Sequence, residues 1–307
     1  MSGGPTRSVL VTGASGFLAA WTIEALAGRG TSVTALDLRD DRRRMALVAG
    51  EERARALPWI TGDITEPGML ESALERSGAD SILHLAALTI PACRADPVRG
   101  AEVDVIGHIR VMEAARRHSI ARLVYSSSAA VHPRGPFKAP ANLYGVFKRA
   151  CEDIARVYAL EHGLMSVGVR PQIVYGLGRD DGETSAITKA IRAAALGEAY
   201  EVPFRGTACF QYAGEIAEVL VRCLDASPQA PVVSDITTVV ESTDDLLAAI
   251  LAEIPGARVT LGPNERAAPD CPLDRAPLEQ LIGPWPRVGI REGVRATIDH
   301  YRRGGGG

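Results

Sequence analysis

The sequence has no long apolar run: none of its hydrophobic stretches approaches the ~18 residues that a membrane span needs. The start, MSGGPTRSVLVTG, lacks the apolar stretch of a signal peptide. The chain also contains no CxxC pair and no metal-ligand spacing. We therefore expect no membrane partner, no bound metal, reduced thiols and a cytoplasmic location. The five cysteines are Cys93, Cys151, Cys209, Cys223 and Cys271.

An excess of positive charge is also missing, because the formal net charge of the 307 residues is -3. The one short basic run, Arg42-Arg43-Arg44, is interpreted as a solvated helix face. Nucleic acid is therefore not an expected partner. The length is sufficient for a large hydrophobic core and a second lobe.

Short apolar runs alternate with helical patterns through the first half of the chain. Expected strands cover 8–13, 32–37, 81–87, 121–128 and 165–176, and expected helices cover 17–30, 67–78, 102–119 and 143–163. This alternation predicts an α/β fold of the Rossmann type, a doubly wound parallel sheet with helices on both faces.

The pattern changes near residue 177, where the elements become shorter and richer in proline. We expect residues 1–176 to form a dinucleotide-binding domain, to which part of 205–240 returns. Residues 177–303 are predicted to form mainly a smaller substrate-binding lobe. The ending, from 304 to 307, is expected to be a disordered tail.

A glycine loop, VTGASGFLA, joins the first expected strand to the first helix. Gly13 permits a tight turn, and Gly16 allows a ligand to approach the backbone closely. The helix beginning near Phe17 presents free N–H groups and a positive dipole end to a pyrophosphate. Ala19 occupies the third small position, where the helix meets the strand.

Asp37 ends the second expected strand, where an acid can bind the ribose hydroxyls of adenosine and repel a 2′-phosphate. The cofactor is therefore expected to be NAD. Arg39 and Arg42 nearby keep NADP as the less favoured alternative.

Tyr144 and Lys148 lie four residues apart in an expected helix, which places both side chains on one face. A phenol is a weak acid near neutral pH, and a neighbouring ammonium stabilises the phenolate. The pair is therefore a candidate for proton transfer, although such spacing also arises by chance.

Several motifs along the chain resemble those of a known family and occur in the same order. They are TGASGFLA, Asp37, GDI at 62–64, HLAA at 84–87, YSSSAAV at 125–131, YGVFK at 144–148 and RPQIVYGLG at 170–178. The chain resembles the extended short-chain dehydrogenase/reductase superfamily, and within it the NAD-dependent epimerase/dehydratase family. The resemblance covers roughly residues 8–225. It implies that Ser128, Tyr144 and Lys148 are catalytic.

The resemblance also implies the cofactor site. Asp63 and Ile64 should flank the adenine, and Pro171 should lie near the nicotinamide. Ser127 is a further candidate for contact with the cofactor. The complete expected set is Gly13, Ser15, Gly16, Phe17, Leu18, Asp37, Asp63, Ile64, Leu85, Ala86, Ala87, Tyr144, Lys148 and Pro171.

Several positions depart from the family pattern. Asp104 stands where the family usually has asparagine, which puts the usual contacts there in doubt. Ile173 and Ala208 stand where sugar-nucleotide members carry an asparagine and an arginine for the diphosphate. Arg205 would replace the latter only with a shifted loop. Ala129 and Ala130 replace the acidic pair of the dehydratases, so that elimination of water would lack its acid and base.

The segment between Ser128 and Tyr144, with 15 residues, is also shorter than is common in the sugar-nucleotide members. The favoured function is therefore an NAD-dependent dehydrogenase or carbonyl reductase acting on a small hydroxylated or carbonyl substrate. The alternative is a sugar or nucleotide-sugar epimerase with tightly retained NAD. A non-catalytic NAD-sensing protein is a third hypothesis.

Few substrate residues can be assigned from the sequence. Arg179, Asp180 and Thr184 are candidates, but Thr184 or Ser185 can equally be a helix N-cap. His84 is interpreted as structural, whereas His132 either faces the substrate or lies in a loop.

By family resemblance, the helices at 102–119 and 144–162 could form a homodimer interface, which a monomer on a sizing column would exclude.

Overall fold

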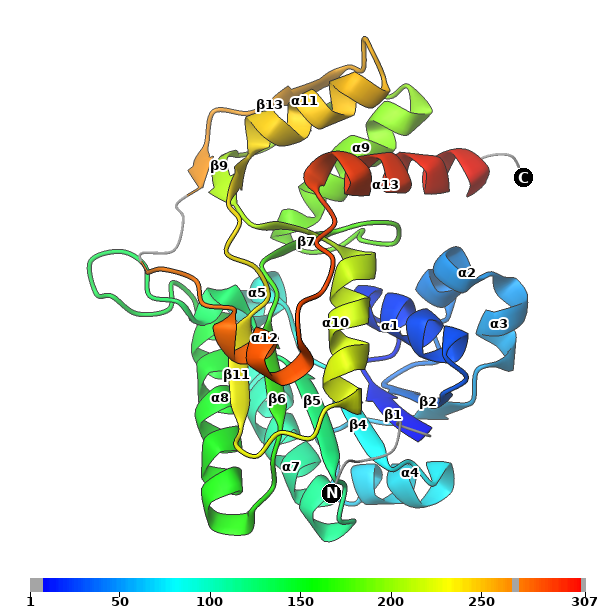
Figure 1. Cartoon of the computed structure of the whole chain (residues 1–307), viewed down its shortest axis with the longest axis vertical. Helices are drawn as coiled ribbons and strands as arrows, with labels where there is room; N and C mark the ends of the chain where they lie inside the picture. The colour runs from blue at the N-terminus through cyan, green and yellow to red at the C-terminus, as the bar shows by residue number, and fades with distance from the viewer. Residues whose placement is uncertain (1–7, 267–270, 305–307) are drawn as a thin grey trace.

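The computed structural model describes residues 8–266 and 271–304. Within these residues a seven-stranded sheet, with strand order β11-β6-β5-β4-β1-β2-β3, forms the centre of the larger lobe (Figure 1). Its strands are β1 Ser8–Thr12, β2 Ser32–Asp37, β3 Trp59–Thr61, β4 Ser81–His84, β5 Arg122–Ser126, β6 Val167–Arg170 and β11 Val232–Asp235. All neighbours pair in parallel, which confirms the predicted doubly wound sheet. The order reverses between β1 and β4, the point at which such sheets bind ligands.

The strands are apolar because both faces of the sheet are covered. Val9 and Val11 of β1 pack into the hydrophobic core on one face, and Leu10 packs into the core on the other. All three are fully buried. A continuous apolar run is typical of such a strand.

Two layers of helices cover the sheet. The layer on one face contains α1 Phe17–Gly28 and α10 Ala213–Asp225. The layer on the other face contains α4 Met69–Ser77, α7 Gly107–Arg117 and α8 Leu143–His162. Shorter helices at the edges and in the loops are α2 Arg43–Ala49, α3 Glu51–Ala56, α5 Ile90–Ala95 and α6 Pro97–Ala101.

The smaller lobe has its own hydrophobic core above the carboxyl ends of the sheet strands (Figure 1). Its helices are α9 Ala186–Leu196, α11 Thr243–Glu253 and α13 Ile290–Gly304. Its strands pair as β7 Ile173–Tyr175 with β10 Phe210–Tyr212, β8 Tyr200–Val202 with β13 Val259–Leu261, and β9 Arg205–Ala208 with β12 Glu241–Ser242 and β14 Glu265–Arg266.

The strand expected over 165–176 is two strands in two different sheets. β6 ends at Arg170 within the central sheet, whereas β7 begins at Ile173 and pairs with β10. Pro171 lies at the break, where its lack of an N–H group prevents a ladder hydrogen bond. The core of the smaller lobe therefore begins with Ile173, before the expected boundary at 176.

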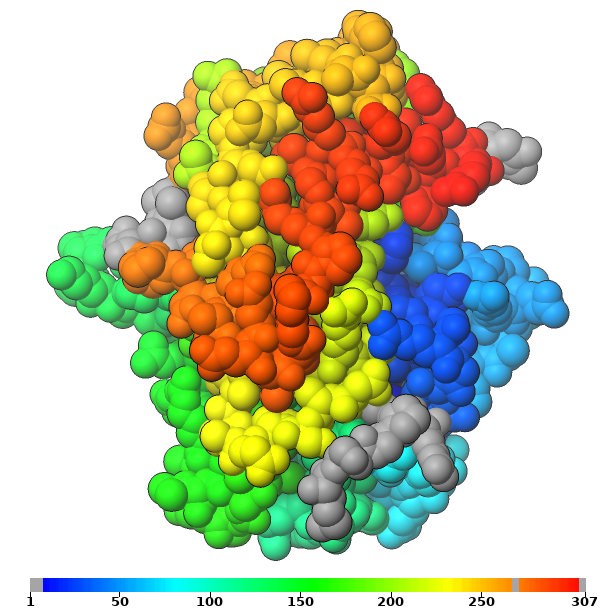
Figure 2. Space-filling model, in the orientation of Figure 1, coloured from blue at the N-terminus to red at the C-terminus, as the bar shows by residue number. Residues whose placement is uncertain are grey.

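The chain crosses between the lobes several times. α10 and β11 return to the larger lobe, within the expected 205–240 segment. The helix α12 Ala276–Ile282 returns as well, and packs against α10 and β11 beside the central sheet (Figure 2). α13 then extends to Gly304, the first residue of the expected tail, and residues 305–307 lie outside the described part.

The long helix expected over 102–119 contains a π-helical turn, Glu102–Ile106, between α6 and α7. Gly107 follows this turn and lies against Ile64, since a Cβ at Gly107 would be 2.7 Å from the Cδ1 atom of Ile64. Ile106 and two residues of α8, Val157 and Leu160, are apolar and exposed. Among the described helices, none is long and apolar enough to cross a membrane.

Candidate functional site

The glycine loop brings the amino end of α1 against the carboxyl end of β4. Gly13 has a φ angle of 71°, and a Cβ atom there would lie 2.5 Å from the Ala86 nitrogen. Gly16 is the N-cap of α1, and no acidic side chain occupies the first turn. The first N–H groups of the helix lack intrahelical partners and attract anions. Phe17 and Leu18 line a cavity of about 290 Å³ at this end of the helix.

Asp37 lies at the end of β2, beside the glycine loop. Its carboxylate accepts the Ser15 N–H at 2.9 Å and the Leu38 N–H at 2.7 Å. Asp37 and Ser15 line a second cavity, of about 330 Å³. The carboxylate therefore holds the loop and also faces the space beside it.

The basic run after β2 does not form one solvated face. Arg44 folds over the glycine loop, donating to the Ser15 carbonyl at 3.0 Å and forming an ion pair with Asp180. Arg42 turns the other way, and its guanidinium donates to the carbonyls of Ala54 and Leu57 at 2.7 and 3.0 Å. Arg44 was missed by the sequence analysis, and Arg42 is engaged away from the cavity that Asp37 faces.

Asp63 and Ile64 line the far end of the 330 Å³ cavity. The carboxylate of Asp63 accepts the N–H and O–H groups of Thr65 and forms a 2.5 Å ion pair with Arg99. Burial alone would raise the pKa of Asp63, but these donors together hold it below its ordinary value. Arg99, a second residue that the sequence analysis missed, also lines the cavity.

Lys148 is held beneath the ring of Tyr144 on α8. Its ammonium donates to the Ser126 carbonyl at 2.8 Å and lies 5.7 Å from the Tyr144 ring centre. Burial opposes the charge on Lys148, but the neighbouring Tyr144 and Asp104 outweigh it and raise the pKa of Lys148 above its ordinary value. Lys148 therefore remains an ammonium in a buried position.

Ser128 and Tyr144 reach the same cavity because α8 starts directly against the turn that follows Ser128. Asn142 caps α8 by accepting the Gly145 N–H at 2.9 Å. A Cβ atom on Gly145 would lie 2.3 Å from the Ala130 carbonyl oxygen, so only glycine permits this approach. The Ser128 Oγ accepts the Ala130 N–H at 3.1 Å, which leaves its own O–H free to donate.

Three cavities follow one another from Asp63 to the smaller lobe. The 330 Å³ and 290 Å³ cavities share Gly13, Gly16, Leu85 and Ala87, and the latter shares Tyr144 with a third, of about 440 Å³. The expected cofactor residues that line the first two cavities are Gly13, Ser15, Gly16, Phe17, Leu18, Asp37, Asp63, Ile64, Leu85, Ala86, Ala87, Tyr144 and Lys148. Ser128 lines the third.

Two residues that were expected to contact the cofactor, Pro171 and Ser127, do not line these three cavities. Pro171 is buried and does not line these three cavities, and its carbonyl accepts the Ala129 N–H at 2.9 Å. Ser126, rather than Ser127, lines the cavity beside Lys148. The Ser127 hydroxyl instead donates to the buried carboxylate of Glu152 at 2.6 Å.

Asp104, which stands where the family asparagine was expected, is buried beside the 330 Å³ and 290 Å³ cavities. Its carboxylate accepts the Leu88 N–H at 2.7 Å and lies 3.8 Å from the Cys93 sulfur. Burial raises the pKa of Asp104, although Lys148 opposes that rise. Asp104 therefore fixes the segment after β4, which lines the cavities.

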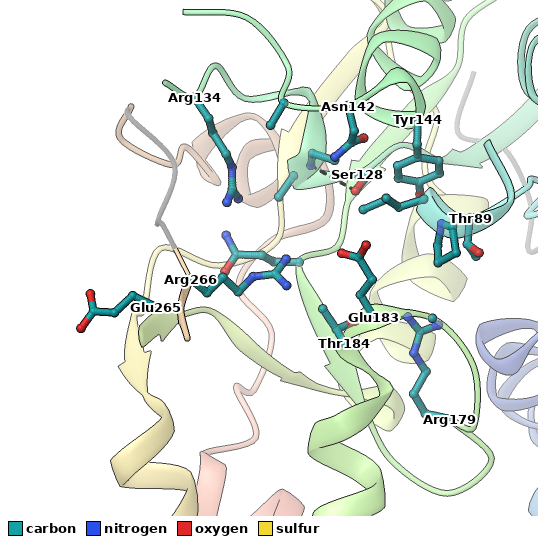
Figure 3. A pocket seen from close by; sticks show the side chains of 17 residues that line it. Thr89, Ser128, Arg134, Asn142, Tyr144, Arg179, Glu183, Thr184, Glu265 and Arg266 are labelled. Atoms are coloured by element: carbon teal, nitrogen blue, oxygen red, sulfur yellow. Dashed lines mark hydrogen bonds between the residues drawn. The ribbon is translucent and has the colours of Figure 1, made fainter. Parts of the chain in front are cut away.

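The third cavity lies between the two lobes. Figure 3 shows Ser128 and Tyr144 on one wall, with Arg179 and Thr184 opposite them. The lining residues not foreseen from the sequence include Arg134, Glu183, Glu265 and Arg266. Three cationic side chains, those of Arg134, Arg179 and Arg266, therefore border a cavity that Tyr144 also lines.

At two positions the sugar-nucleotide members carry polar side chains for the diphosphate, and here these positions offer no polar side chain to the 440 Å³ cavity. Ile173 and Ala208 are buried in β7 and β9. Arg205 has a side chain that is 51% exposed and lies 3.9 Å from Asp244, and it does not line the 440 Å³ cavity. The N-cap of α9 is Ser185, without a side-chain hydrogen bond.

The two histidines considered as candidates from the sequence, His84 and His132, are both buried. His84 is bonded to Thr12 at 2.8 Å, and burial lowers its pKa well below the ordinary value, so the ring is neutral. His132 was expected either to face the substrate or to lie in a loop. It is bonded to Asp235 at 2.7 Å and does not line the 440 Å³ cavity.

Comparison with protein families gives a match to the model described as "NAD dependent epimerase/dehydratase family", over residues 9–234. A UDP-glucose 4-epimerase of Mycolicibacterium smegmatis is 26% identical over 313 residues, 95% of this chain and 98% of that enzyme. A UDP-glucose 4-epimerase of Pisum sativum is 29% identical over 166 residues, 49% of this chain, and the match spans only 47% of the pea enzyme.

Solved structures share the fold across nearly the whole chain. A UDP-glucose 4-epimerase of Thermus thermophilus, in complex with NAD, superposes with a TM-score of 0.77 and 25% identity, covering 96% of this chain and 99% of that one. An L-threonine dehydrogenase from Clostridium difficile gives a TM-score of 0.83 at 18% identity, covering 99% and 100%. The fold is therefore shared by enzymes with different reactions.

Proposed function

Because the chain belongs to the NAD-dependent epimerase/dehydratase family, we propose that it transfers a hydride between NAD and a small hydroxylated or carbonyl substrate. The observation that carries this proposal is the position of Tyr144, which lines both the cavity at the glycine loop and the cavity that contains Ser128. NAD is the cofactor of the family and, when bound, accepts or donates the hydride.

The chain's own groups move and position the proton. Tyr144 takes the proton of a substrate alcohol, or returns it to a carbonyl oxygen. Lys148 stabilises the phenolate form of Tyr144 through its buried ammonium, which the Ser126 carbonyl holds in place. Ser128 donates its free O–H to the substrate oxygen and orients it toward Tyr144. Positioning and proton transfer therefore share the catalytic work.

The cavities beside the glycine loop fit a dinucleotide. Gly13 and Gly16 leave the amino end of α1 open to a pyrophosphate, and Arg44 adds positive charge above the loop. Asp37 would hold the adenosine ribose, and Asp63 and Ile64 would flank the adenine. Since Arg42 is bound to backbone carbonyls, it does not offer a 2′-phosphate site, which favours NAD over NADP.

Replacement of Asp37 by Ala is expected to weaken NAD binding by about tenfold or more, since hydrogen bonds to a charged group contribute about 1.5–3 kcal/mol. Discrimination against NADP should fall because the repelling charge is gone. Titration calorimetry with both cofactors measures this. Asp41→Ala, which removes a carboxylate that pairs with Arg43, is the matched control. Equal affinities for NAD and NADP in the parent protein would show that Asp37 has another role.

Epimerisation of a nucleotide sugar is the second candidate. The Mycolicibacterium smegmatis relative, which matches 95% of this chain, is a UDP-glucose 4-epimerase. The cavity between the lobes also carries Arg134, Arg179 and Arg266, cations that suit an anionic substrate. An epimerase oxidises and re-reduces one substrate, so it must retain its cofactor through the cycle.

The amount of retained NAD separates the two reactions. Purified protein is denatured, and the nicotinamide cofactor released per chain is quantified. An empty chain that binds NAD reversibly supports the dehydrogenase, because that enzyme exchanges its cofactor each turnover. Near-stoichiometric NAD supports the epimerase. A chain that neither retains nor binds NAD contradicts both, and one that binds NAD but turns over no alcohol, carbonyl or nucleotide sugar is the NAD-sensing protein.

The exposed apolar residues Ile106, Val157 and Leu160 support a further part of this proposal, a homodimer through the face of α7 and α8. The residues of α8 that pack into the core on the sheet side are Ile154, Ala155 and Tyr158, and neither Val157 nor Leu160 is among them. Burial of such side chains in a partner stabilises association.

A further inference from the structure

A cysteine, a histidine and an aspartate contact one another in sequence, apart from the proposed redox residues Ser128, Tyr144 and Lys148. The Cys271 sulfur is 3.2 Å from Nδ1 of His132, and Nε2 of His132 is 2.7 Å from Oδ1 of Asp235. The three residues come from the segment before α12, the loop after Ser128, and β11. We propose that Cys271, His132 and Asp235 form a nucleophilic thiol site that takes small electrophiles, independently of the redox reaction.

The surroundings fix the roles of the two histidine nitrogens. Asp235 is 2% exposed, and its second oxygen accepts the Asp274 N–H at 3.0 Å and lies 3.9 Å from the Arg170 guanidinium. This carboxylate accepts the Nε2–H of His132, so Nδ1 presents its lone pair to the thiol. The same order of groups, thiol, imidazole and a side-chain acceptor, activates cysteine nucleophiles on unrelated folds.

A cavity of about 290 Å³ opens beside Cys271 and gives an electrophile room to bind. It is lined by Gln172, Thr207, Ala208, Thr238, Val240, Cys271, Pro272 and Leu273. Gln172 also lines the cavity that contains Tyr144. The Nε2 atom of Gln172 is buried, and within the described residues it has no hydrogen-bond partner.

The other four cysteines provide an internal comparison. All are buried, whereas Cys271 is half-buried. Burial raises the pKa of Cys93 to about 11 and the pKa values of Cys151 and Cys209 to about 12, and it also raises the pKa of Cys223. These thiols are therefore protonated at neutral pH and unreactive.

The reaction at Cys271 balances without another co-reactant. The thiol proton moves to Nδ1 of His132, which leaves a thiolate beside an imidazolium. With iodoacetamide as the probe, the sulfur forms a bond to the methylene carbon as the carbon–iodine bond breaks. Iodide leaves with the electron pair, and a thioether remains on Cys271.

The test is the rate of alkylation of each cysteine by iodoacetamide at neutral pH, followed by mass spectrometry of peptides. Cys271 should react about tenfold faster than a small thiol of ordinary pKa, because only a few per cent of such a thiol is ionised. His132→Gln should lower the Cys271 rate about tenfold. His162→Gln, at the exposed end of α8, is the matched control and should leave the rate unchanged.

The parent protein provides a second test that does not depend on the folding of a variant. A thiolate–imidazolium pair predicts that the Cys271 rate changes little from about pH 6 to about pH 8, whereas an ordinary thiol gains about tenfold per pH unit there. An ordinary profile, or equal rates in the parent and His132→Gln, would overturn the proposal. Both measurements are made without NAD or substrate, so their outcome is separate from that of the redox proposal.

Discussion

Replacing Tyr144 by Phe is expected to lower kcat by about 10²–10⁴-fold, the usual contribution of a positioned proton donor or acceptor. The affinity for NAD should be nearly unchanged. The ring remains above Lys148, and the ammonium still donates to the Ser126 carbonyl. Steady-state turnover and calorimetric NAD binding measure the two effects separately.

The matched control for this variant is Tyr158→Phe on the same helix. The Tyr158 hydroxyl donates to Glu113 at 3.0 Å, away from the three cavities. Its loss should leave kcat near the parental value. Full turnover in Tyr144→Phe would mean that another group carries the proton, and the proposed roles of Tyr144 and Lys148 would then be wrong.

Replacing Glu152 by Ala is expected to lower the free energy of unfolding by about 3–5 kcal/mol, the usual cost of removing one partner from a buried ion pair. The Glu152 carboxylate is fully buried and receives Nε and Nη2 of Arg170 at 2.7 and 2.6 Å. Without it, the ion pair that remains to the Arg170 guanidinium among the described residues is the one with Asp235, at 3.9 Å. The hydroxyl of Ser127 also loses its acceptor.

Urea unfolding followed by circular dichroism measures this loss. Glu161→Ala is the control, because Glu161 lies at the exposed end of the same helix, and such substitutions usually change stability by less than about 0.5 kcal/mol. A loss below about 1 kcal/mol in Glu152→Ala would show that the ion pair does not stabilise the junction of α8 and β6.

Features encoded within one short stretch of sequence could be predicted. The strand, glycine loop and helix around Gly13 follow one another directly, and Asp37 ends the next strand where the apolar run stops. Tyr144 and Lys148 share a face because both belong to one helix with a clear N-cap, Asn142. Local periodicity is sufficient for such arrangements.

Features that depend on distant contacts could not be predicted. Nothing in Arg42-Arg43-Arg44 indicates that Arg44 alone covers the glycine loop, since its partner Asp180 is far along the chain. Arg134 and Arg266 meet in one cavity only because the two lobes face each other.

Which serine of the run after β5 reaches the cavities could not be predicted. The run continues in extended backbone to Ser128, so Ser126 and Ser128 lie on one side of the chain and Ser127 on the other. Ser126 therefore faces the cavity beside Lys148, and Ser127 turns to the buried Glu152. The change of sheet at Pro171 likewise depends on pairing with β10, which the apolar run over 165–176 does not reveal.

The transfer of deuterium from NADH that carries deuterium at C4 to a panel of small ketones and keto-sugars tests the central claim most directly. Parent protein and Tyr144→Phe are compared, and the products are analysed by mass spectrometry. The account predicts deuterium on the new carbinol carbon with the parent protein and at least about 100-fold less with Tyr144→Phe. Equal transfer by the two proteins, or no transfer to any ketone while the cofactor is bound, would contradict hydride transfer at the Tyr144 site.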